Sequence, residues 1–470
     1  MSNQDDEIGL IGLGVMGRNF ALNLADHGFP VAVYNRNSAK IREFMDSEAG
    51  ERPIAPAYTL KEFLGQLKRP RAVILLVSAG RAVDAVLDEL RPLLETGDLI
   101  IDGGNSNFHD TDRRGQSLAG AGLLYMGMGV SGGEKGARFG PSLMPGGPRE
   151  GYDRVRLLLE AAAAQVNNEP CVAYLGPGSA GHYVKMVHNG IEYGLEQLIA
   201  ETYDLLKLGL GFNNDDLHTL FAQWNQEELQ SYLVEITSQI FTRVDEKTGE
   251  RLVDVILDVA RQKGTGIWTC QEAMDARVPV PTIDLAVAVR CLSAMKAERE
   301  AASRVLPAPA IQVSQDRQGF AAKMKNALYA AMIVTYAQGL ALLRQASTAY
   351  GYQLDLETVA RIWRGGCIIR AALLEDVRAA YQHQPELLNL LLDPHLGREV
   401  SSRQGDWRQV LQSAVAWGIP TPGLMVSLAY WDGYRRARLP ANLIQAQRDY
   451  FGAHTYERVD LPGTFHTEWD

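Results

Sequence analysis

Cysteine is scarce in this 470-residue sequence: Cys171, Cys270, Cys291 and Cys367 lie far apart and form no C-x-x-C pair. Such spacing excludes a disulfide framework or a cysteine zinc site as the organising feature of the fold. We therefore expect a reducing, cytoplasmic environment. The nine histidines do not combine with the cysteines in a metal-binding pattern, so we also expect no metal site.

The sequence has little that would favour a membrane or a nucleic acid as a partner. We find no uninterrupted apolar run that approaches the roughly 20 residues needed to cross a bilayer. Basic residues number 46 against 56 acidic ones, which gives a formal net charge of −10, and they form no basic block. We therefore expect neither a membrane nor a nucleic acid. A small anionic ligand would need local positive charge to overcome the overall negative field.

The two halves of the chain have different hydrophobic patterns. Up to about residue 178, short aliphatic runs alternate with helical stretches, which predicts an α/β domain with a parallel sheet covered on both faces. The strands that we expect are Ile8–Leu13, Val31–Tyr34, Ala72–Val77, Leu99–Asp102, Leu123–Met126 and Val172–Leu175. From residue 179 to about 436, helical spacing predicts an all-α domain. The aromatic-rich residues 437–470 predict a tail that packs on a second subunit.

The helical half contains a weak internal repeat. Lys185-Met186 is followed by Lys323-Met324 138 residues later, and Trp224 by Trp363 139 residues later. Chance agreement between two helical segments rich in leucine and alanine would also produce such matches. Because the offset persists over about 40 residues, we interpret the repeat as a duplicated helical unit.

A glycine-rich turn directly after the first expected strand predicts a dinucleotide site. Three glycines form the pattern G-x-G-x-x-G before an expected helix. Glycine permits the tight turn, lets the backbone approach the pyrophosphate, and lets helix and strand pack closely. The residues that we assign to this cofactor turn are Gly12, Leu13, Gly14, Val15, Met16 and Gly17.

The end of the second expected strand favours NADP over NAD. NAD-binding folds usually place Asp or Glu there to bond the ribose hydroxyls, but this chain has Asn35-Arg36-Asn37. No carboxylate would repel a 2′-phosphate, and Arg36 can pair with that phosphate or stack on adenine. The alternative is an arginine that is merely solvated in a loop.

Two further turns end strands at the sheet edge where ligands of open α/β sheets bind. Asp102-Gly103-Gly104-Asn105-Ser106 follows one expected strand, and Gly129-Val130-Ser131-Gly132-Gly133 follows another. Either stretch could be only a turn. Two such turns at one edge, each with a small polar side chain, predict a ligand site.

Helical spacing after Gly181 brings four polar side chains together. Lys185, His188 and Glu192 lie at i, i+3 and i+7 and share one face, and Asn189 lies one turn from Lys185. Burying such a row is costly unless its members bond each other or a ligand. A solvated polar stripe is the alternative, but glycines and apolar residues flank this row. We interpret it as part of the ligand site.

At these residues the chain resembles the 6-phosphogluconate dehydrogenase family, the decarboxylating NADP-dependent enzymes of the pentose phosphate pathway. The resemblance covers nearly the whole chain and includes the cofactor turn, both later turns, the helix 185–193, Lys263-Gly264-Thr265-Gly266, Arg290 and the run 447–454. It implies a Rossmann-like NADP-binding domain (1–178), then a large all-α substrate and dimerisation domain with an internal duplication (179–436). It also implies a homodimer in which the tail (437–470) completes the partner's site.

The resemblance further implies a reaction and residue roles. The C3 hydroxyl of 6-phosphogluconate is oxidised by hydride transfer to NADP, C1 is lost as carbon dioxide, and an enediol becomes ribulose 5-phosphate. Lys185 would be the general base, and Glu192 the general acid that protonates the enediol. The implied substrate contacts are Asn105, Ser131, Gly132, Gly133, His188, Asn189, Tyr193, Lys263, Thr265 and Arg290, with Arg448 and His454 from the partner subunit.

The resemblance extends the cofactor site and shows three departures. The further cofactor contacts that it implies are Val77, Ser78, Ala79 and Asn105. Asn37 stands where the family commonly has Ser or Thr, and Ser78 and Ile267 replace lysines. The replacements at positions 78 and 267 remove positive charge. They bear on how strongly the chain prefers NADP over NAD, and less on which reaction it catalyses.

Two other functions stay open. A related β-hydroxyacid dehydrogenase, such as 3-hydroxyisobutyrate dehydrogenase, shares the Rossmann-like domain and a helix lysine. Such relatives have a shorter helical domain and no comparable tail, and they need no Lys263 or Arg290 for a phosphate. A catalytically silent NADP-binding protein is the second alternative, against which the intact Lys185 and Glu192 argue.

Overall fold

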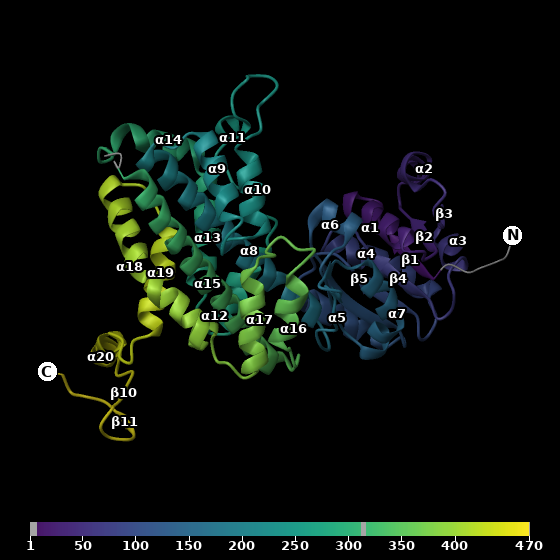
Figure 1. Cartoon of the computed structure of the whole chain (residues 1–470). Coiled ribbons are helices and arrows are strands. Elements are labelled where there is room, and N and C mark those ends of the chain that lie inside the picture. Colours follow the sequence, from purple (N-terminus) through teal and green to yellow (C-terminus); the bar gives the residue numbers. More distant parts are fainter. Residues whose placement is uncertain (1–6, 312–315, 470) are drawn as a thin grey trace.

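The computed structural model describes residues 7–311 and 316–469. An α/β domain and a helical domain lie side by side, and a C-terminal tail projects from the helical domain (Figure 1). The sheet has the order β3-β2-β1-β4-β5-β6-β7. The elements of the α/β domain are β1 (Ile8–Ile11), α1 (Val15–Asp26), β2 (Val31–Tyr34), α2 (Ser38–Phe44), β3 (Ile54–Ala57), α3 (Leu60–Gly65), β4 (Ala72–Leu75), α4 (Arg81–Leu90), β5 (Leu99–Asp102), α5 (Phe108–Ala119), β6 (Leu124–Val130), α6 (Gly133–Phe139), β7 (Leu143–Gly146) and α7 (Arg149–Ala162).

Five of the six expected strands are confirmed, and one is wrong. β2 and β5 have the expected bounds, and β1, β4 and β6 differ from the expectation mainly at their carboxyl ends. The expected strand Val172–Leu175 is instead an irregular segment, in which Val172 makes one isolated bridge to Leu143. The segment makes backbone hydrogen bonds to β7, from the Leu143 amide to Cys171 and from the Leu175 amide to Pro145, both at 2.9 Å, but it does not form a continuous ladder.

Two edge strands, β3 and β7, are absent from the sequence-based expectation. Each contains a proline, Pro56 in β3 and Pro145 in β7, and proline lowers the expectation of a strand because it cannot donate to a ladder. Both strands lie at the edges of the sheet, where proline is tolerated. β7 also corrects the expectation of an entirely parallel sheet, because it runs antiparallel to β6.

Alternate residues of the central strands pack on opposite faces of the sheet. Leu10 of β1 packs on the same side as Phe20 of α1, whereas Ile11 packs on the other side with Phe63 of α3 and Leu87 of α4. A sheet buried on both faces is typical of parallel α/β domains. It leaves the ends of the strands as the place where ligands can reach the backbone.

The helical domain packs around two long helices, α8 and α15, which lie against each other. Its elements are α8 (Ala180–Asp204), the π-helical turn Leu205–Gly209, α9 (Asn214–Trp224), α10 (Tyr232–Ile240), α11 (Leu252–Val255), α12 (Thr265–Asp275), α13 (Pro281–Ala294), α14 (Lys296–Val305), α15 (Arg317–Tyr350), α16 (Leu356–Trp363), α17 (Leu373–His383), α18 (Pro394–Trp417) and α19 (Pro422–Tyr434). Among the described residues, α15 is long and apolar enough to cross a membrane, which corrects our reading of the apolar runs. Its most apolar window is 89% buried within the fold, so α15 serves here as a core helix.

The helical domain has the internal repeat that the sequence suggests. Each copy has a long helix, α8 or α15, followed by a short helix that ends at a tryptophan, Trp224 or Trp363. Later in each copy, Val278-Pro279-Val280-Pro281 and Ile419-Pro420-Thr421-Pro422 precede α13 and α19 at an offset of 141 residues. The two N-termini of α13 and α19 are therefore equivalent positions of one repeated unit.

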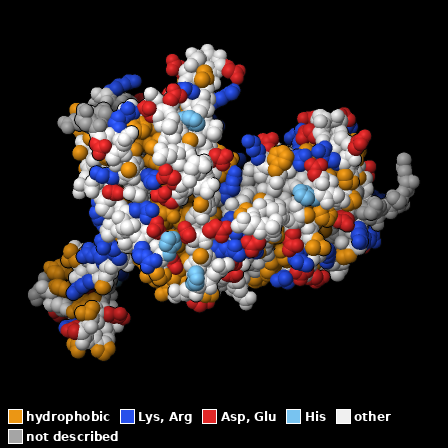
Figure 2. Space-filling view, in the orientation of Figure 1, with side chains coloured by type: hydrophobic (Ala, Val, Ile, Leu, Met, Phe, Trp, Pro, Cys, Tyr) orange, Lys and Arg blue, Asp and Glu red, His pale blue; other side chains and the backbone are white. Residues whose placement is uncertain are grey.

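The tail forms a helix, α20 (Ala441–Gly452), and a small hairpin of β10 (Tyr456–Glu457) and β11 (Thr464–Phe465). The buried carboxylate of Asp449 joins the two, because it accepts from the backbone of Thr455 and Thr467 and from the indole of Trp469. Hydrophobic side chains gather on the outside of this tail (Figure 2). Phe451 is 71% exposed, so the tail has its own fold but leaves apolar surface uncovered.

Candidate active site

The predicted cofactor turn joins β1 to α1 as expected. Gly12 has φ +108°, and a Cβ there would lie 2.4 Å from the carbonyl oxygen of Leu76. A Cβ on Gly17 would lie 1.8 Å from the oxygen of Gly12, whereas a Cβ on Gly14 would point into open space. Two glycines therefore permit the close packing of strand and helix. The third leaves room for a pyrophosphate at the N-terminus of α1.

In the loop after β2, two residues stabilise the loop itself and one is available to bind a ligand. Asn35 accepts from the Leu13 amide at 3.0 Å and donates to the carbonyl of Asn37, while Asn37 caps α2 by accepting from Ala39. The side chains of Asn35 and Asn37 thus shape the loop. The Arg36 side chain is exposed and makes no hydrogen bond or ion pair to another described residue, so its guanidinium is available for a 2′-phosphate or an adenine ring.

The turn that carries Asn105 is fixed by a buried carboxylate. Asp102 accepts from the Gly104 amide at 3.0 Å, the Ser106 hydroxyl at 2.6 Å and the Tyr125 hydroxyl at 3.0 Å. Arg114 approaches the same carboxylate at 3.5 Å and is itself 1% exposed. The network holds the turn at the end of β5 in one shape, with Asn105 at its apex. Val77 packs beside it on the β4 side, and Ser78 and Ala79 are exposed.

The polar row of α8 is assembled as its spacing predicts. Lys185 donates from Nζ to Ser131 Oγ at 3.0 Å and lies 3.4 Å from His188 Nδ1. His188 Nδ1 contacts Asn189 Oδ1 at 3.0 Å and lies 3.8 Å from the carboxylate of Glu192. The glycine-rich turn after β6 and the helix α8 therefore meet at one buried polar cluster. The alternative of a solvated stripe is excluded.

Burial shifts the proton affinities in this cluster in opposite directions. The pKa of Lys185 is lowered because its ammonium form is desolvated, and the pKa of His188 falls well below its usual value for the same reason. Burial raises the pKa of Glu192 to about 7. Desolvation disfavours charge, so burial shifts Lys185 toward the neutral amine, which can accept a proton, and Glu192 toward the protonated acid, which can donate one.

A second group of predicted residues lies at the far end of the row. Asn189 donates to Thr265 Oγ1 at 3.3 Å, and the guanidinium of Arg290 lies 3.5 Å from the ring centre of Tyr193. Lys263 precedes α12, is exposed, and makes no hydrogen bond or ion pair to another described residue. This end of the row thus has one exposed and one stacked cation, the kind of group that pairs with an anionic part of a ligand.

Arg448 and His454 are not brought to this cluster within one chain. Both are exposed on the tail, and Arg448 contacts Gln445 of its own helix at 3.3 Å. The tail stands away from the α/β domain and its neighbouring helices (Figure 1). Within this structure the two side chains therefore lie apart from the polar row.

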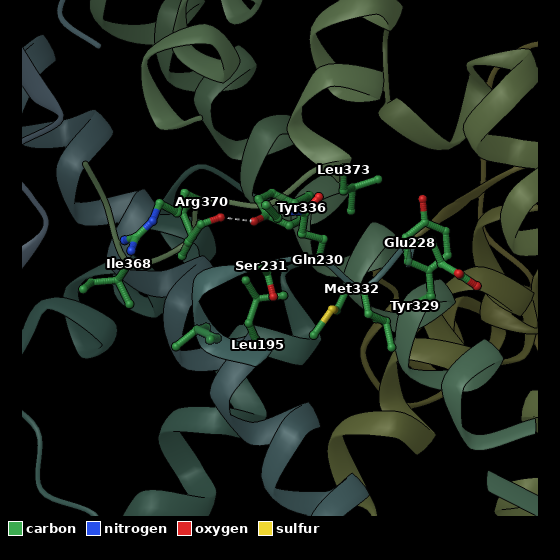
Figure 3. A pocket seen from close by; sticks show the side chains of 14 residues that line it. Leu195, Glu228, Gln230, Ser231, Tyr329, Met332, Tyr336, Ile368, Arg370 and Leu373 are labelled. Carbon is green, nitrogen blue, oxygen red and sulfur yellow. Dashed lines mark hydrogen bonds between the residues drawn. The ribbon is translucent and has the colours of Figure 1, made fainter. Parts of the chain in front are cut away.

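A small cavity lies apart from the polar row, between α8, α15 and the segment before α17 (Figure 3). It measures about 20 Å³, and among the described residues that line it are Leu195, Met332, Tyr336 and Ile368. Tyr336 donates to the carbonyl of Ile369 at 2.6 Å on its wall. Such a volume suits a single water molecule and is too small for a substrate.

Several residues at the cluster were missed by sequence reasoning. Cys367 is buried near Lys185, donates to the carbonyl of Trp363, and has its pKa raised to about 12 by burial. A Cβ on Gly132 would lie 2.5 Å from the oxygen of Gly366, so the second helical repeat closes over the glycine-rich turn. Cys367 and Gly366 lie more than 180 positions from Lys185 and Gly132, the predicted residues that they approach, so the sequence held no local signal for them.

One missed residue did carry a local signal. Glu196 follows Glu192 by one helical turn on the same face of α8. Its carboxylate accepts from Arg290, and burial raises its pKa although Arg290 opposes the rise. Continuing the i, i+4 pattern beyond Glu192 would have identified it.

Two family models match the chain. The NAD binding domain of 6-phosphogluconate dehydrogenase matches residues 7–176, and the 6-phosphogluconate dehydrogenase C-terminal domain matches residues 181–469. The chain is similar to the 6-phosphogluconate dehydrogenase, decarboxylating, of Synechococcus elongatus, with 55% identity over 98% of this chain and 99% of that one. It is 53% identical to the NADP(+)-dependent, decarboxylating enzyme of Bacillus subtilis over the full length of both.

A solved structure agrees with these relatives. The 6-phosphogluconate dehydrogenase of Plasmodium falciparum, studied as apo protein and with NADP+ or 6-phosphogluconate, superposes with a TM-score of 0.95 at 44% identity. The match covers 98% of this chain and 100% of the other. With both domains matched and the polar row in place, the chain belongs to the 6-phosphogluconate dehydrogenase family.

Proposed function

We propose that this chain oxidises 6-phosphogluconate with NADP and decarboxylates it to ribulose 5-phosphate. The observation that carries the proposal is the buried row of α8, where Lys185 and Glu192 flank His188 beside Ser131. Its shifted proton affinities provide a base and an acid in one site. The relatives in S. elongatus and B. subtilis are named for the same reaction.

The cofactor fits the α/β domain. The pyrophosphate would lie against Gly14 at the N-terminus of α1, and Arg36 would hold the 2′-phosphate. NADP, when bound, supplies the acceptor for a hydride. The turn that carries Asn105, held by Asp102, would place an amide between cofactor and substrate.

Lys185 starts the chemistry as the general base. Its neutral amine removes the proton of the C3 hydroxyl while a hydride leaves C3, and the hydroxyl becomes a keto group. The lysine, now protonated, donates a hydrogen bond to the keto oxygen and stabilises the negative charge that develops there when the C1–C2 bond breaks and carbon dioxide leaves. Ser131 holds the Nζ atom in place at 3.0 Å throughout.

Glu192 completes the reaction as the general acid. The enediol left by decarboxylation needs a proton on C2, the carbon that lost its carboxylate. Because burial keeps Glu192 protonated up to a pH of about 7, it can deliver that proton. Lys185, which gives its proton to the C3 oxygen as the enediol forms, takes that proton back while C2 is protonated, and the C3 oxygen returns to the keto form of ribulose 5-phosphate.

We further propose a cytoplasmic homodimer in which Arg448 and His454 of one chain reach the phosphate site of the other. The exposure of both residues supports this arrangement, as does the uncovered apolar surface of the tail, including Phe451. Arg290 and Lys263 would supply two cations to the phosphate site, and Arg448 of the other chain would be the third that surrounds a phosphate dianion.

The direct test is a product assay with NADP and 6-phosphogluconate. We expect NADPH and carbon dioxide in equal amounts. NADPH without carbon dioxide, or turnover of 3-hydroxyisobutyrate instead, would indicate the related β-hydroxyacid dehydrogenase activity. Cofactor binding with no turnover of either acid would indicate a silent NADP-binding protein.

A further inference from the structure

Arg290, the cation that we assign to the substrate's phosphate, already has an anionic partner. Its guanidinium donates to the carboxylate of Glu196 on α8 and, through a second nitrogen, to the carbonyl of Arg261 at 3.2 Å. The same guanidinium stacks on the Tyr193 ring. Of these three contacts, only Glu196 can carry a negative charge, so it is the anionic partner of the arginine.

The two partners differ in how far they can move. The Arg290 side chain is 14% exposed, whereas that of Glu196 is 41% exposed. The ring of Tyr193 and the Arg261 carbonyl hold the guanidinium, and the glutamate is free to turn toward solvent. A carboxylate and a phosphate also present similar charged oxygens to a guanidinium. One can therefore replace the other without a displacement of Arg290.

We infer that Glu196 is a positioning residue that occupies the phosphate's place on Arg290 and yields it when the sugar phosphate binds. The inference rests on the proposed function, because it requires a phosphate on Arg290. The exchange lowers the affinity for substrate, since an ionised Glu196 beside a phosphate dianion repels it. Glu196 thus keeps Arg290 oriented and at the same time weakens phosphate binding.

The pH dependence of this exchange follows from the groups around Glu196. The charged groups that face it are Arg290 on α13 and Glu192 on its own helix. Burial raises the pKa of Glu196 above its ordinary value, so the carboxylate becomes neutral at a higher pH than an exposed glutamate. Once neutral, it no longer competes with the phosphate.

The variant Glu196→Gln tests the inference, because its amide oxygen can still accept from Arg290 while the charge is lost. We expect the KM for 6-phosphogluconate at pH 8 to fall about fivefold, and inorganic phosphate to inhibit more strongly by a similar factor. The difference from the wild type should shrink as the pH falls. Because Glu196 also raises the pKa of Glu192, the alkaline limb of kcat should move to lower pH.

Two further variants serve as controls. Glu298→Gln removes one charge from the exposed face of α14, and its KM should equal that of the wild type. Glu196→Leu removes both the charge and the acceptor, so its KM should exceed that of Glu196→Gln. An unchanged or higher KM in Glu196→Gln, while Arg290→Ala raises the KM, would overturn the inference and leave the proposed function intact. A wild type that does not turn over 6-phosphogluconate would refute both.

Discussion

Burial acts on two side chains of α8 with opposite chemical consequences. Desolvation lowers the pKa of Lys185 and raises that of Glu192 to about 7. Each shift favours the form that is rare for that group in water at neutral pH. A base that must accept a proton first and an acid that must donate one later need these starting states.

The pH dependence of turnover should report Glu192. Its pKa is raised to about 7, and a general acid works only when protonated, so kcat should fall as the pH rises through about 7. Replacing it by glutamine should lower kcat by about two to four orders of magnitude and abolish this alkaline limb. Persistence of the limb in Glu192→Gln, measured by NADPH formation from pH 5.5 to 9, would assign it to another group.

At the residue scale, helical spacing alone predicts much of the polar row on α8. Lys185, His188 and Glu192 were predicted to share a face, because helical periodicity fixes neighbours within one element. Cys367 and Gly366 could not be predicted, since their contacts depend on how the second helical repeat folds back over the α/β domain. The cofactor assignment of Asn35 and Asn37 stays a prediction, and the hydrogen bonds by which their side chains stabilise the loop were not predicted.

Helices of one repeat are capped by side chains of the other. At the N-terminus of α19, the amides of Gly423 and Leu424 donate to Glu201 on α8, at 2.7 and 2.9 Å. At the equivalent N-terminus of α13, the amide of Thr282 donates to Gln338 on α15 at 3.0 Å. Helix N-termini leave unpaired amides, and this exchange pairs them across the repeat. It also fixes α13, the helix that carries Arg290.

Removing one of these caps should destabilise the helical domain. Glu201→Ala leaves two buried amides without their acceptor, so we expect the free energy of unfolding to fall by about 1–3 kcal/mol. Urea or thermal unfolding would measure the loss. The matched control Glu246→Ala, whose side chain is 85% exposed, should change stability by less than about 0.5 kcal/mol. Equal effects of the two variants would contradict the capping account.

At the level of elements, the buried central strands were predictable and the edges were not. Strands β2 and β5 are continuous aliphatic runs, the pattern of a strand buried on both faces. β3 and β7 contain proline and lie at edges, where hydrophobic pattern and propensity are weakest. The segment 172–175 shows the opposite error, because it bonds to β7 at a few positions without the regular pairing that defines a strand.

The whole molecule is acidic, with a net charge of −10, yet its proposed ligands are anions. Positive charge is concentrated locally instead. Lys185 is buried at the cluster, Arg290 is stacked on Tyr193, and Arg36 is available on the loop after β2. A global charge disfavours polyanionic polymers and surfaces, but it does not decide the field inside one cleft. In our proposal, Arg448 on the tail of the partner chain adds a further positive charge to that cleft.

Hybrid dimers would test whether the tail acts across the interface. In our proposal, Lys185→Met inactivates a chain's own site, whereas Arg448→Ala weakens the site of its partner. If the two variants are mixed, dissociated and allowed to reassociate, some dimers should contain one chain of each variant. In such a hybrid dimer, one active site carries both substitutions and the other carries neither. If the rate of NADPH formation per hybrid dimer rises toward half of the wild-type rate, this result supports the action of Arg448 on the partner's site. No recovery, with hybrid formation shown by mass, would place Arg448 in its own chain's site.

The central claim is that buried Lys185 is the base of a decarboxylating dehydrogenase, and NADPH formation by the Lys185→Met variant tests it most directly. With saturating 6-phosphogluconate and NADP, we expect the wild type to form NADPH and carbon dioxide in equal amounts. The variant should bind NADP with unchanged affinity and form neither product, a loss of at least about a thousandfold in kcat. Turnover by Lys185→Met at a rate near that of the wild type would contradict the account.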